Sequence, residues 1–280
     1  MSRMAEKDFA NRAELAAWIL NDGYKEHFAV ANGLLNYSER LMGNRVGADK
    51  DSKYAHAMAL LGGKAYKSYL SSVLLGSQGL VEDMGIIARS LVNLCIVARW
   101  ISDTDREARA RRYIGWIWVE MFEMTRSIPA PPRVKVEIEK MHKSVRGLFQ
   151  SRNKKGKLIS WKYWHNSSIK QMASEVGMLE YYRGYYAPLS ATEHSSALAY
   201  FGMAATKTSS GDIVIGLGDH RFLAEYLKCV FVCFADVLAL WNDVFKVAKE
   251  PELQAKISQG IDFFKRIQSR PPVAPNTRQP

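Results

Sequence analysis

The chain has 280 residues and a mass of 31.7 kDa, enough to bury a substantial core in one large domain or two small ones. Hydrophobic residues make up 48% and charged residues 24%, a balance that excludes an intrinsically disordered protein. The 39 basic and 28 acidic residues give a formal charge of +11, which favours nucleic acid, acidic ligands or anionic membrane surfaces as partners. Proteins that bind none of these can carry the same excess.

The first 50 residues are expected to form one or two helices that make an N-terminal helical extension. Asn11 is suited to cap the first helix, and Leu15 and Trp18 follow at helical spacing. The glycine, asparagine and aspartate residues of 43–51 predict a loop after them. No uninterrupted apolar region opens the sequence, so we expect no signal peptide.

Four helices are expected in the middle of the chain, where helix formers recur between residues that break a helix. The breaks are a glycine pair at 76 and 79, a Ser-Asp pair at 102 and 103, and three prolines between 129 and 132. The expected helices are 52–75, 80–101, a third from Asp103 or Thr104 to about 125, and 133–149, and a basic loop follows at 153–156.

Much of the excess positive charge lies in two stretches of this region, 106–112 and 146–157. Clustered Lys and Arg residues are typical of surfaces that bind phosphate groups. RNA or another anionic ligand is therefore the partner that the charge favours, and no membrane partner is expected.

The stretch 161–205 combines dense aromatic residues with small and polar ones, so it can line a pocket or lock helices together. A serine at 167 or 168 is suited to cap a helix whose apolar stripe ends at Leu179. Pro188 interrupts the helical pattern, and a new helix is expected near Ser190.

The C-terminal third begins with a loop at 206–218 that contains a short strand at 213–215. Asp219 is suited to cap an apolar helix that continues to 246. This helix carries Glu225, Lys228 and Asp236, and these charges predict a buried core helix rather than a membrane span.

Together these elements predict an all-α fold, a multi-helix bundle of long antiparallel helices with at most a minor pair of short strands. A last amphipathic helix is expected at 252–267. Residues 51–268 are predicted to form the main helical domain and 269–280 a disordered tail. Apolar helices and exposed aromatics make a homo-oligomer an open alternative to a monomer.

The cysteines Cys95, Cys229 and Cys233 lie in apolar runs without the spacing of metal ligands. Buried free thiols fit a reducing compartment, so we expect a cytoplasmic protein. The sequence contains no HExxH, paired CxxC, phosphate-binding loop or GxGxxG motif, and it predicts neither a metal nor a cofactor.

Three polar residues share one face of the helix at 80–101. Glu82, Arg89 and Asn93 are separated by seven and four residues and are surrounded by aliphatic side chains. A guanidinium in such surroundings needs a partner, because leaving it unpaired costs several kcal/mol. Arg89 is therefore a candidate for a functional site, or a structural residue that ties helices together.

His194 is the second candidate, in a group with Ser190, Tyr182 and Tyr186. A serine and a histidine four residues apart lie on one helix face, but no third residue completes a hydrolytic triad. A lone histidine on a helix is often structural, and this alternative stays open.

The segment 168–178 has the apolar and small residues of the first half of a helix-turn-helix. The following helix does not fit a recognition helix, because Arg183 takes the place of an inward aliphatic residue and Pro188 interrupts it. A DNA-binding regulator is kept as a second alternative function.

These motifs resemble a family of prokaryotic all-helical proteins of unknown function, over about residues 55–245. Its members carry Arg-Ser-Leu-Phe-Glu on one element, which Arg89 begins here, and Tyr-x3-Tyr-x2-Leu-Ser-x3-His on another, which runs from Tyr182 to His194. The resemblance implies a helical fold, but it does not indicate an activity. This sequence departs at Asn93, where the family usually has Glu.

An effector that acts on RNA or a nucleotide, with a role in stress or phage defence, is the function that these observations favour. The helical build invites comparison with the helical ribonucleases of toxin and phage-defence systems. Those enzymes place Arg four to six residues before His, a spacing that this sequence lacks. In this hypothesis Arg89 stabilises phosphate charge and His194 acts as general acid or base, as the catalytic pair. The first alternative is a non-catalytic module that binds a ligand or a protein, and whether the chain is an enzyme stays open.

Overall fold

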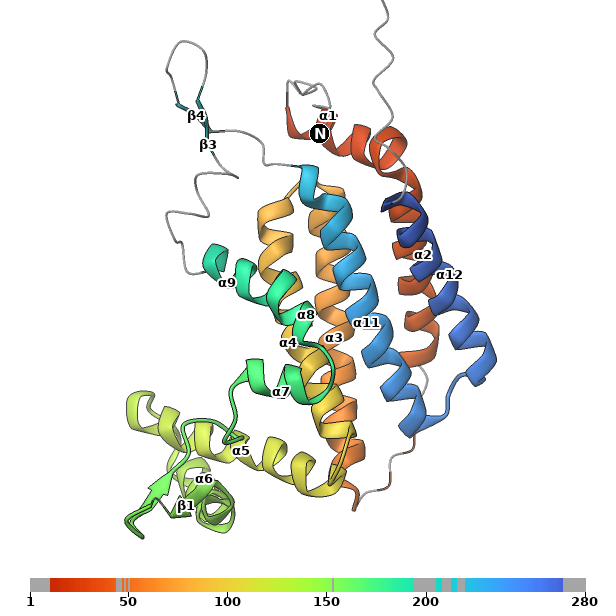
Figure 1. Ribbon diagram of the computed structural model, residues 1–280. Helices are drawn as coiled ribbons and strands as arrows, with labels where there is room; N and C mark the ends of the chain where they lie inside the picture. The colour runs from red at the N-terminus through yellow and green to blue at the C-terminus, as the bar shows by residue number, and fades with distance from the viewer. Residues whose placement is uncertain are drawn as a thin grey trace, which may run out of the picture.

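Three long helices, α3 (Lys53–Ser77), α4 (Val81–Ser102) and α11 (Leu223–Phe245), pack against one another at the centre of the fold (Figure 1). The computed structural model describes residues 11–43, 47, 49, 51–152, 154–193, 205–207, 213–215 and 220–268. Within α11, apolar side chains are buried on several sides, as expected for a helix that neighbours enclose. The prediction of an all-α fold is confirmed.

Close approach of α3 and α11 depends on a glycine. A Cβ atom at Gly62 would lie 2.5 Å from the Trp241 ring, so a larger residue there would separate the two helices. The N-terminus of α3 begins at the predicted place, because the Ser52 hydroxyl accepts a hydrogen bond from the Ala55 amide at 3.0 Å.

One side of this core is covered by α2 (Lys25–Met42) and α12 (Glu250–Gln268), which also pack against each other (Figure 1). A short helix α1 (Arg12–Trp18) and the π-helical turn η1 (Ile19–Gly23) precede α2. Asn11 caps α1 as expected, with its side chain accepting from the Glu14 amide at 3.0 Å. The boundary predicted between residues 50 and 51 stays a prediction, and 269–280 lies outside the described residues.

The opposite side of α4 is covered by a second helical segment, made of α7 (Ile169–Glu175), α8 (Leu179–Tyr181), the π-helix η3 (Tyr182–Tyr186) and α9 (Ala187–Glu193). Ser168 caps α7, as one of the two predicted caps, by accepting from the Gln171 amide at 3.2 Å. Gly177 has a φ of +71° in the turn that follows, a conformation that favours glycine.

The predicted break at Pro188 does not occur. The helical path continues from η3 into α9, and the Ala187 amide donates to the Tyr182 carbonyl, five residues back. Proline normally disrupts a helix because it lacks an N–H and its ring meets the carbonyl four residues earlier. The wider π turn just before Pro188 moves that carbonyl out of the ordinary helical ladder, so the chain stays helical.

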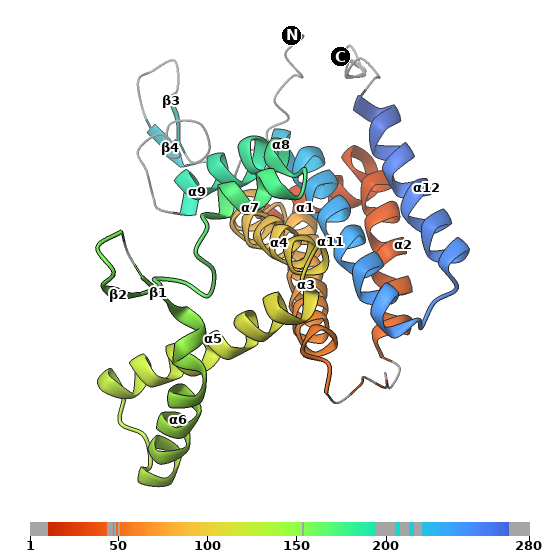
Figure 2. The same cartoon turned by 60° about the horizontal axis from the view of Figure 1, so that its bottom comes forward.

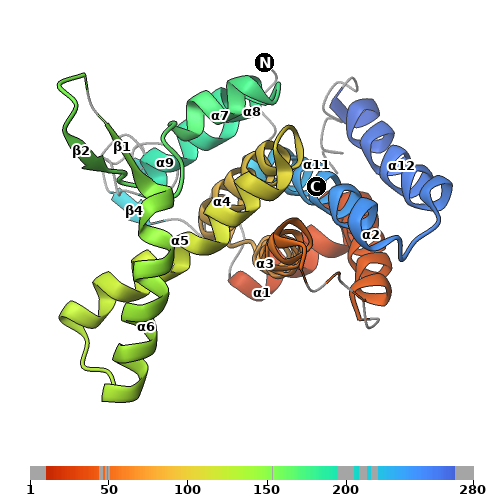
Figure 3. The same ribbon diagram turned by 90° about the horizontal axis from the view of Figure 1, so that it is seen from below.

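A hairpin of two helices, α5 (Arg106–Ser127) and α6 (Pro132–Val145), projects from the bundle (Figures 2 and 3). The helix expected to reach residue 149 ends at 145, and a 3-10 turn η2 (Arg146–Phe149) leads into strands β1 (Gln150–Arg152) and β2 (Leu158–Ser160). These strands pair antiparallel, with Gln150 opposite Ser160. We call residues 106–162 the arm.

The arm joins the bundle at Trp100, near the end of α4. Arg109 of α5 lies over the Trp100 ring at 3.9 Å and donates to the Trp100 carbonyl. The Trp100 indole N–H donates to Glu175 of α7 at 2.6 Å, and Trp164 packs edge-on against the same ring. One side chain therefore connects the bundle, the arm and α7.

Two further strands, β3 (Ala205–Lys207) and β4 (Ile213–Ile215), pair antiparallel, and β4 is the strand expected at 213–215. The 3-10 turn η4 (His220–Phe222) precedes α11, and the proposed cap Asp219 lies outside the described residues. Among the described helices, α4 alone is long and apolar enough to cross a membrane, but 61% of the relevant window is buried inside the protein. A core helix has the same character, so this is weak evidence for a span.

His27 gives the packing of α2 against α12 a pH dependence. The ring is 8% exposed and packs against Tyr24, Phe263 and Phe264. Burial lowers the pKa of His27 below its ordinary 6.5, although Glu26 acts in the opposite sense. The unfolded chain therefore takes up a proton before the folded one does, and the free energy of unfolding falls as pH decreases through and below 6.5.

We expect His27→Leu to reduce this loss of stability between about pH 7 and pH 5, measured by urea unfolding at each pH. His56→Leu is the matched control, because His56 is exposed on α3. Equal pH dependence in the wild type and His27→Leu would contradict the assignment.

Candidate functional site

The polar face predicted on α4 lies against the segment that carries the second motif. Glu82, Arg89 and Asn93 are all half-buried, and α4 contacts both η3 and α9. Two segments almost a hundred residues apart in sequence therefore meet where the sequence analysis expected a polar site.

Arg89 and Tyr186 make the direct contact between these segments. The Arg89 Nη2 atom donates to the Tyr186 hydroxyl at 3.3 Å, and the guanidinium carbon lies 4.7 Å from the centre of the Tyr186 ring. Tyr182 stacks on Tyr186 with ring centroids 5.1 Å apart and planes at 20°. The cation thus lies against a tyrosine that a second ring holds in place.

The π-helix η3 begins and ends with the two stacked tyrosines. In an α-helix, residues 182 and 186 would lie four apart on one face, and an extra residue in the turn shifts everything after it around the axis. Single π turns are frequent at functional sites, and Ser190 follows this one on α9.

Gly85 allows α9 to approach α4. A Cβ atom at Gly85 would lie 3.1 Å from the Leu189 side chain and 3.2 Å from the Tyr226 ring. Leu189 is buried by this approach, and its neighbour Ser190 is half-buried. Packing between α4 and α9 therefore positions the serine of the second motif.

Three predicted site residues remain, namely Glu82, Asn93 and His194. Glu82 lies in the first turn of α4, with a buried Oε1 atom. The Oδ1 atom of Asn93 is also buried, and it has no hydrogen-bond partner among the residues that the structure describes. His194 lies outside the described residues, so its approach to Arg89 stays a prediction.

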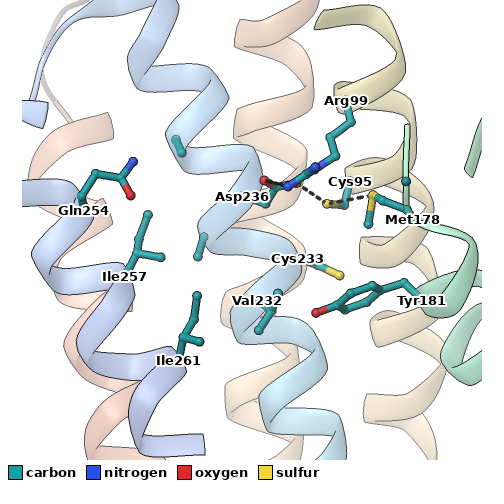
Figure 4. Close-up of a pocket in the computed structure, with 13 residues that line it drawn as sticks. Cys95, Arg99, Met178, Tyr181, Val232, Cys233, Asp236, Gln254, Ile257 and Ile261 are labelled. Atoms are coloured by element: carbon teal, nitrogen blue, oxygen red, sulfur yellow. Dashed lines mark hydrogen bonds and ion pairs between the residues drawn. The ribbon is translucent and has the colours of Figure 1, made fainter. Parts of the chain in front are cut away.

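A second polar cluster, which the sequence analysis did not identify, lines a cavity of about 280 Å³ between α4, α11, α12 and the α7–α8 turn (Figure 4). Arg99 of α4 forms a two-point ion pair with Asp236 of α11, in which Nη2 donates to Oδ1 at 2.6 Å. The Cys95 thiol donates to the same carboxylate at 3.1 Å. The sequence shows Asp236 as a charged residue in an apolar helix, but it does not indicate that Arg99, 137 residues earlier, is its partner.

The thiols and the tyrosine of this cavity are held in their neutral forms. Contact with Cys233 and burial raise the pKa of the Cys95 thiol well above its usual value, and contact with Cys229 does the same for Cys233. Burial raises the pKa of Tyr181 to about 12. Protonated thiols are poor nucleophiles, so this cluster is better suited to hold a ligand than to attack one.

Within the described part of the chain, no group of three or more His, Cys, Asp or Glu side chains is arranged to hold a metal ion.

Nearly all the net positive charge of the protein belongs to the arm. Residues 106–162 contain 15 Lys and Arg residues and five Glu residues, a net charge of +10 compared with +11 for the whole chain. The two basic stretches noted in the sequence are thus parts of one projecting element (Figure 2).

The two helices of the arm bury few of their side chains. Only Ala110 and Gly115 are buried in α5, and only Ile138 in α6. The large hydrophobic side chains that remain exposed on the arm are Ile117, Met124, Ile128, Val134, Val136, Leu158 and Ile159. A cationic projection with an uncovered apolar surface has the character of a contact surface rather than of a core element.

Comparison with known proteins identifies the family. The model of the family of unknown function DUF5677 matches residues 55–208, more than half of the sequence, and the chain therefore belongs to this family. The match includes α3, α4, the arm and the Arg89–Tyr186 contact. No curated protein and no solved structure matches the chain.

We expect Arg89→Ala to lower the free energy of unfolding by about 1–3 kcal/mol, because both the hydrogen bond and the cation–π contact are lost. Tyr186→Phe keeps the ring and should cost only about 0.5–1.5 kcal/mol. Arg183→Ala is the control, since Arg183 on η3 forms an exposed ion pair with Glu180 at 3.2 Å and should change stability by less than about 0.5 kcal/mol. Equal effects of the two arginine substitutions, in urea unfolding, would contradict a stabilising role for Arg89.

Proposed function

We propose that this member of the DUF5677 family is an RNA-directed effector that binds the RNA backbone on its arm. The observation that supports the proposal is the concentration of a net charge of +10 in residues 106–162, which leaves +1 for the rest of the chain. Neutralisation of phosphates by Lys and Arg, with release of counterions, supplies most of the sequence-independent affinity of proteins for nucleic acid.

The form of the arm favours a long polyanion over a small one. Its basic residues are spread over α5, α6 and the β1–β2 hairpin, and lysines at 140, 143, 154 and 162 are all exposed. Cationic side chains spread over several elements match the repeating charges of a nucleic-acid backbone, whereas a single phosphate needs convergent donors.

Duplex DNA is a weaker candidate. The segment 168–178 has a helix-turn-helix pattern in its sequence, but the helical segment that follows directs Tyr186 towards α4, and its exposed residues include Gly184 and Pro188. A recognition helix would present several base-reading polar side chains to the major groove. This favours the arm over the α7–α9 segment as the nucleic-acid contact.

The catalytic part of the proposal assigns phosphate binding to Arg89 and acid–base chemistry to His194. Support comes from the Arg89–Tyr186 contact, which joins α4 to the segment that leads into His194. In this assignment Tyr182 and Tyr186 keep the guanidinium oriented, and Glu82, Asn93 and Ser190 surround the bound group.

A ligand-binding module is the second candidate function, and the cavity at Asp236 favours it. Its lining combines apolar side chains with a few polar groups, among them Arg99, Tyr181 and Gln254, a composition that is common in small-molecule sites (Figure 4).

The arm assignment predicts the salt dependence of RNA binding. We expect the quadruple variant Lys140→Gln, Lys143→Gln, Lys154→Gln and Lys162→Gln to bind single-stranded RNA more weakly. Its slope of log affinity against log salt should be smaller by up to about 2.8, at about 0.7 per lost phosphate contact. Fluorescence anisotropy at several salt concentrations measures both quantities.

The matched control removes four exposed lysines from the bundle, at 64, 67, 249 and 265, and so lowers the net charge by the same amount. It should leave the slope close to that of the wild type. Equal slopes for the two quadruple variants would show that the placement of the charge on the arm has no role.

Catalysis makes a separate prediction. Purified wild-type protein should cleave total RNA, and Arg89→Ala and His194→Ala should each slow cleavage by about 10²–10⁴-fold. Melting curves of the variants establish that they are folded. Equal cleavage by all three proteins, or cleavage by none, would remove the catalytic assignment while leaving RNA binding to be judged by the salt slope.

A further inference from the structure

The loop at 161–167, between β2 and α7, is fixed to the protein at its beginning by Trp161. The Trp161 amide donates to the Phe149 carbonyl at 2.8 Å, and its indole N–H donates to the Ser151 hydroxyl at 3.2 Å. The Trp161 ring also lies edge-on to Phe149, which is buried. This end of the loop is therefore held by backbone, side-chain and packing contacts.

Trp164 fixes the middle of the same loop. Its ring is half-buried between Trp100 of α4 and Tyr113 of α5, with centroid distances of 5.5 and 5.2 Å and edge-on geometry in both cases. His165 follows and accepts a hydrogen bond at Nδ1 from the Ser167 amide at 3.2 Å. The loop lacks regular secondary structure, but contacts hold it at its beginning and in its middle.

Tyr163 lies between these two fixed tryptophans and is directed to solvent. Its side chain is 65% exposed, and its ring is nearly parallel to that of His165, at 18° and 6.2 Å between centroids. Burial lowers the pKa of His165, so the neighbouring ring is neutral at pH 7. An aromatic ring that rigid neighbours hold in an exposed position is preorganised for contact with a flat partner.

Exposed lysines precede Tyr163 in the sequence. Lys162 precedes it, and Lys154, Lys155 and Lys157 lie in the turn of the β1–β2 hairpin that leads to the loop, all of them exposed. The hairpin turn is held by Arg152, which donates to the Gly156 carbonyl at 2.8 Å. An exposed aromatic ring next to Lys162, at the base of a hairpin whose turn carries three more exposed lysines, matches a polymer that carries both flat bases and phosphates.

We propose that the loop 161–167 is a base-stacking platform for single-stranded RNA, with Tyr163 as the ring on which a base stacks. This inference rests on the proposed function and names its substrate class. In a duplex both faces of each base are already stacked within the helix, so an exposed tyrosine finds a free base face only in a single strand or a loop. Every base offers such a face, so the platform selects strandedness rather than sequence.

The test uses fluorescence anisotropy with three probes of similar charge: a single-stranded oligouridine of about 15 nucleotides, an RNA duplex and inorganic polyphosphate. Tyr163→Ala should weaken binding of the single strand by about 5- to 150-fold, the range that loss of one base–aromatic stack gives. Binding of the duplex and of polyphosphate should stay unchanged. The salt slope should also stay unchanged, because tyrosine carries no charge.

Two further variants separate stacking from structural effects. Tyr163→Trp preserves a ring and should retain binding of the single strand. Phe222→Ala removes an exposed ring that lies in η4, far in sequence from the arm, and should change binding of no probe. Melting temperatures of the two Tyr163 variants should match that of the wild type, because Tyr163 is mostly exposed.

The outcomes distinguish this inference from the proposed function. If the wild type binds the single strand and Tyr163→Ala binds it equally well, the platform is overturned and the proposed function stays in place. Equal weakening of all three probes by Tyr163→Ala would also overturn it, since stacking cannot act on polyphosphate. No binding of any probe by the wild type would instead overturn the proposed function itself.

Discussion

The indole of Trp100, at the end of α4, joins the bundle, the arm and α7. Its ring is covered by the guanidinium of Arg109 and touched edge-on by Trp164, and its N–H donates to Glu175. These three partners come from α5, from the loop after the β1–β2 hairpin and from α7. The arm has little core of its own, and it is held to the bundle at this joint and by the packing of α5 against α3, where Glu107 accepts hydrogen bonds from the Ser52 hydroxyl and the Lys53 amide.

Much of the fold could be predicted from apolar periodicity and helix-breaking residues. The helix expected at 80–101 is α4 at 81–102, because caps and core faces are local properties of the sequence. Features that depend on distant partners could not be predicted in this way. The π turn before Pro188 is stable because α4 packs against it. The strands β1 and β2 have three residues each and show no alternation of apolar and polar side chains. The ion pair of Arg99 with Asp236 joins two residues that are 137 positions apart in the sequence.

The candidate site shows the same division between local and distant information. Arg89 and Asn93 are polar residues on an apolar helix, so the sequence predicted that they have a partner inside the protein. The motif with Tyr182 and Tyr186 was the predicted location of that partner. Spacing alone did not indicate that Tyr182 and Tyr186 would lie in a π turn, with Tyr186 in contact with Arg89. In the sequence, the loop that contains Tyr163 could be recognised only as part of a dense run of aromatic residues.

Charge and packing are separated in this molecule: the bundle contains the buried core and is almost neutral, and the arm carries the net charge. The central claim is that the arm is the surface that contacts RNA. Ultraviolet crosslinking of the full chain to single-stranded RNA, followed by mass spectrometry of the crosslinked peptides, tests it most directly. The account predicts crosslinks within 106–165, with Tyr163 among them, and crosslinks confined to α2, α11 and α12 would contradict it.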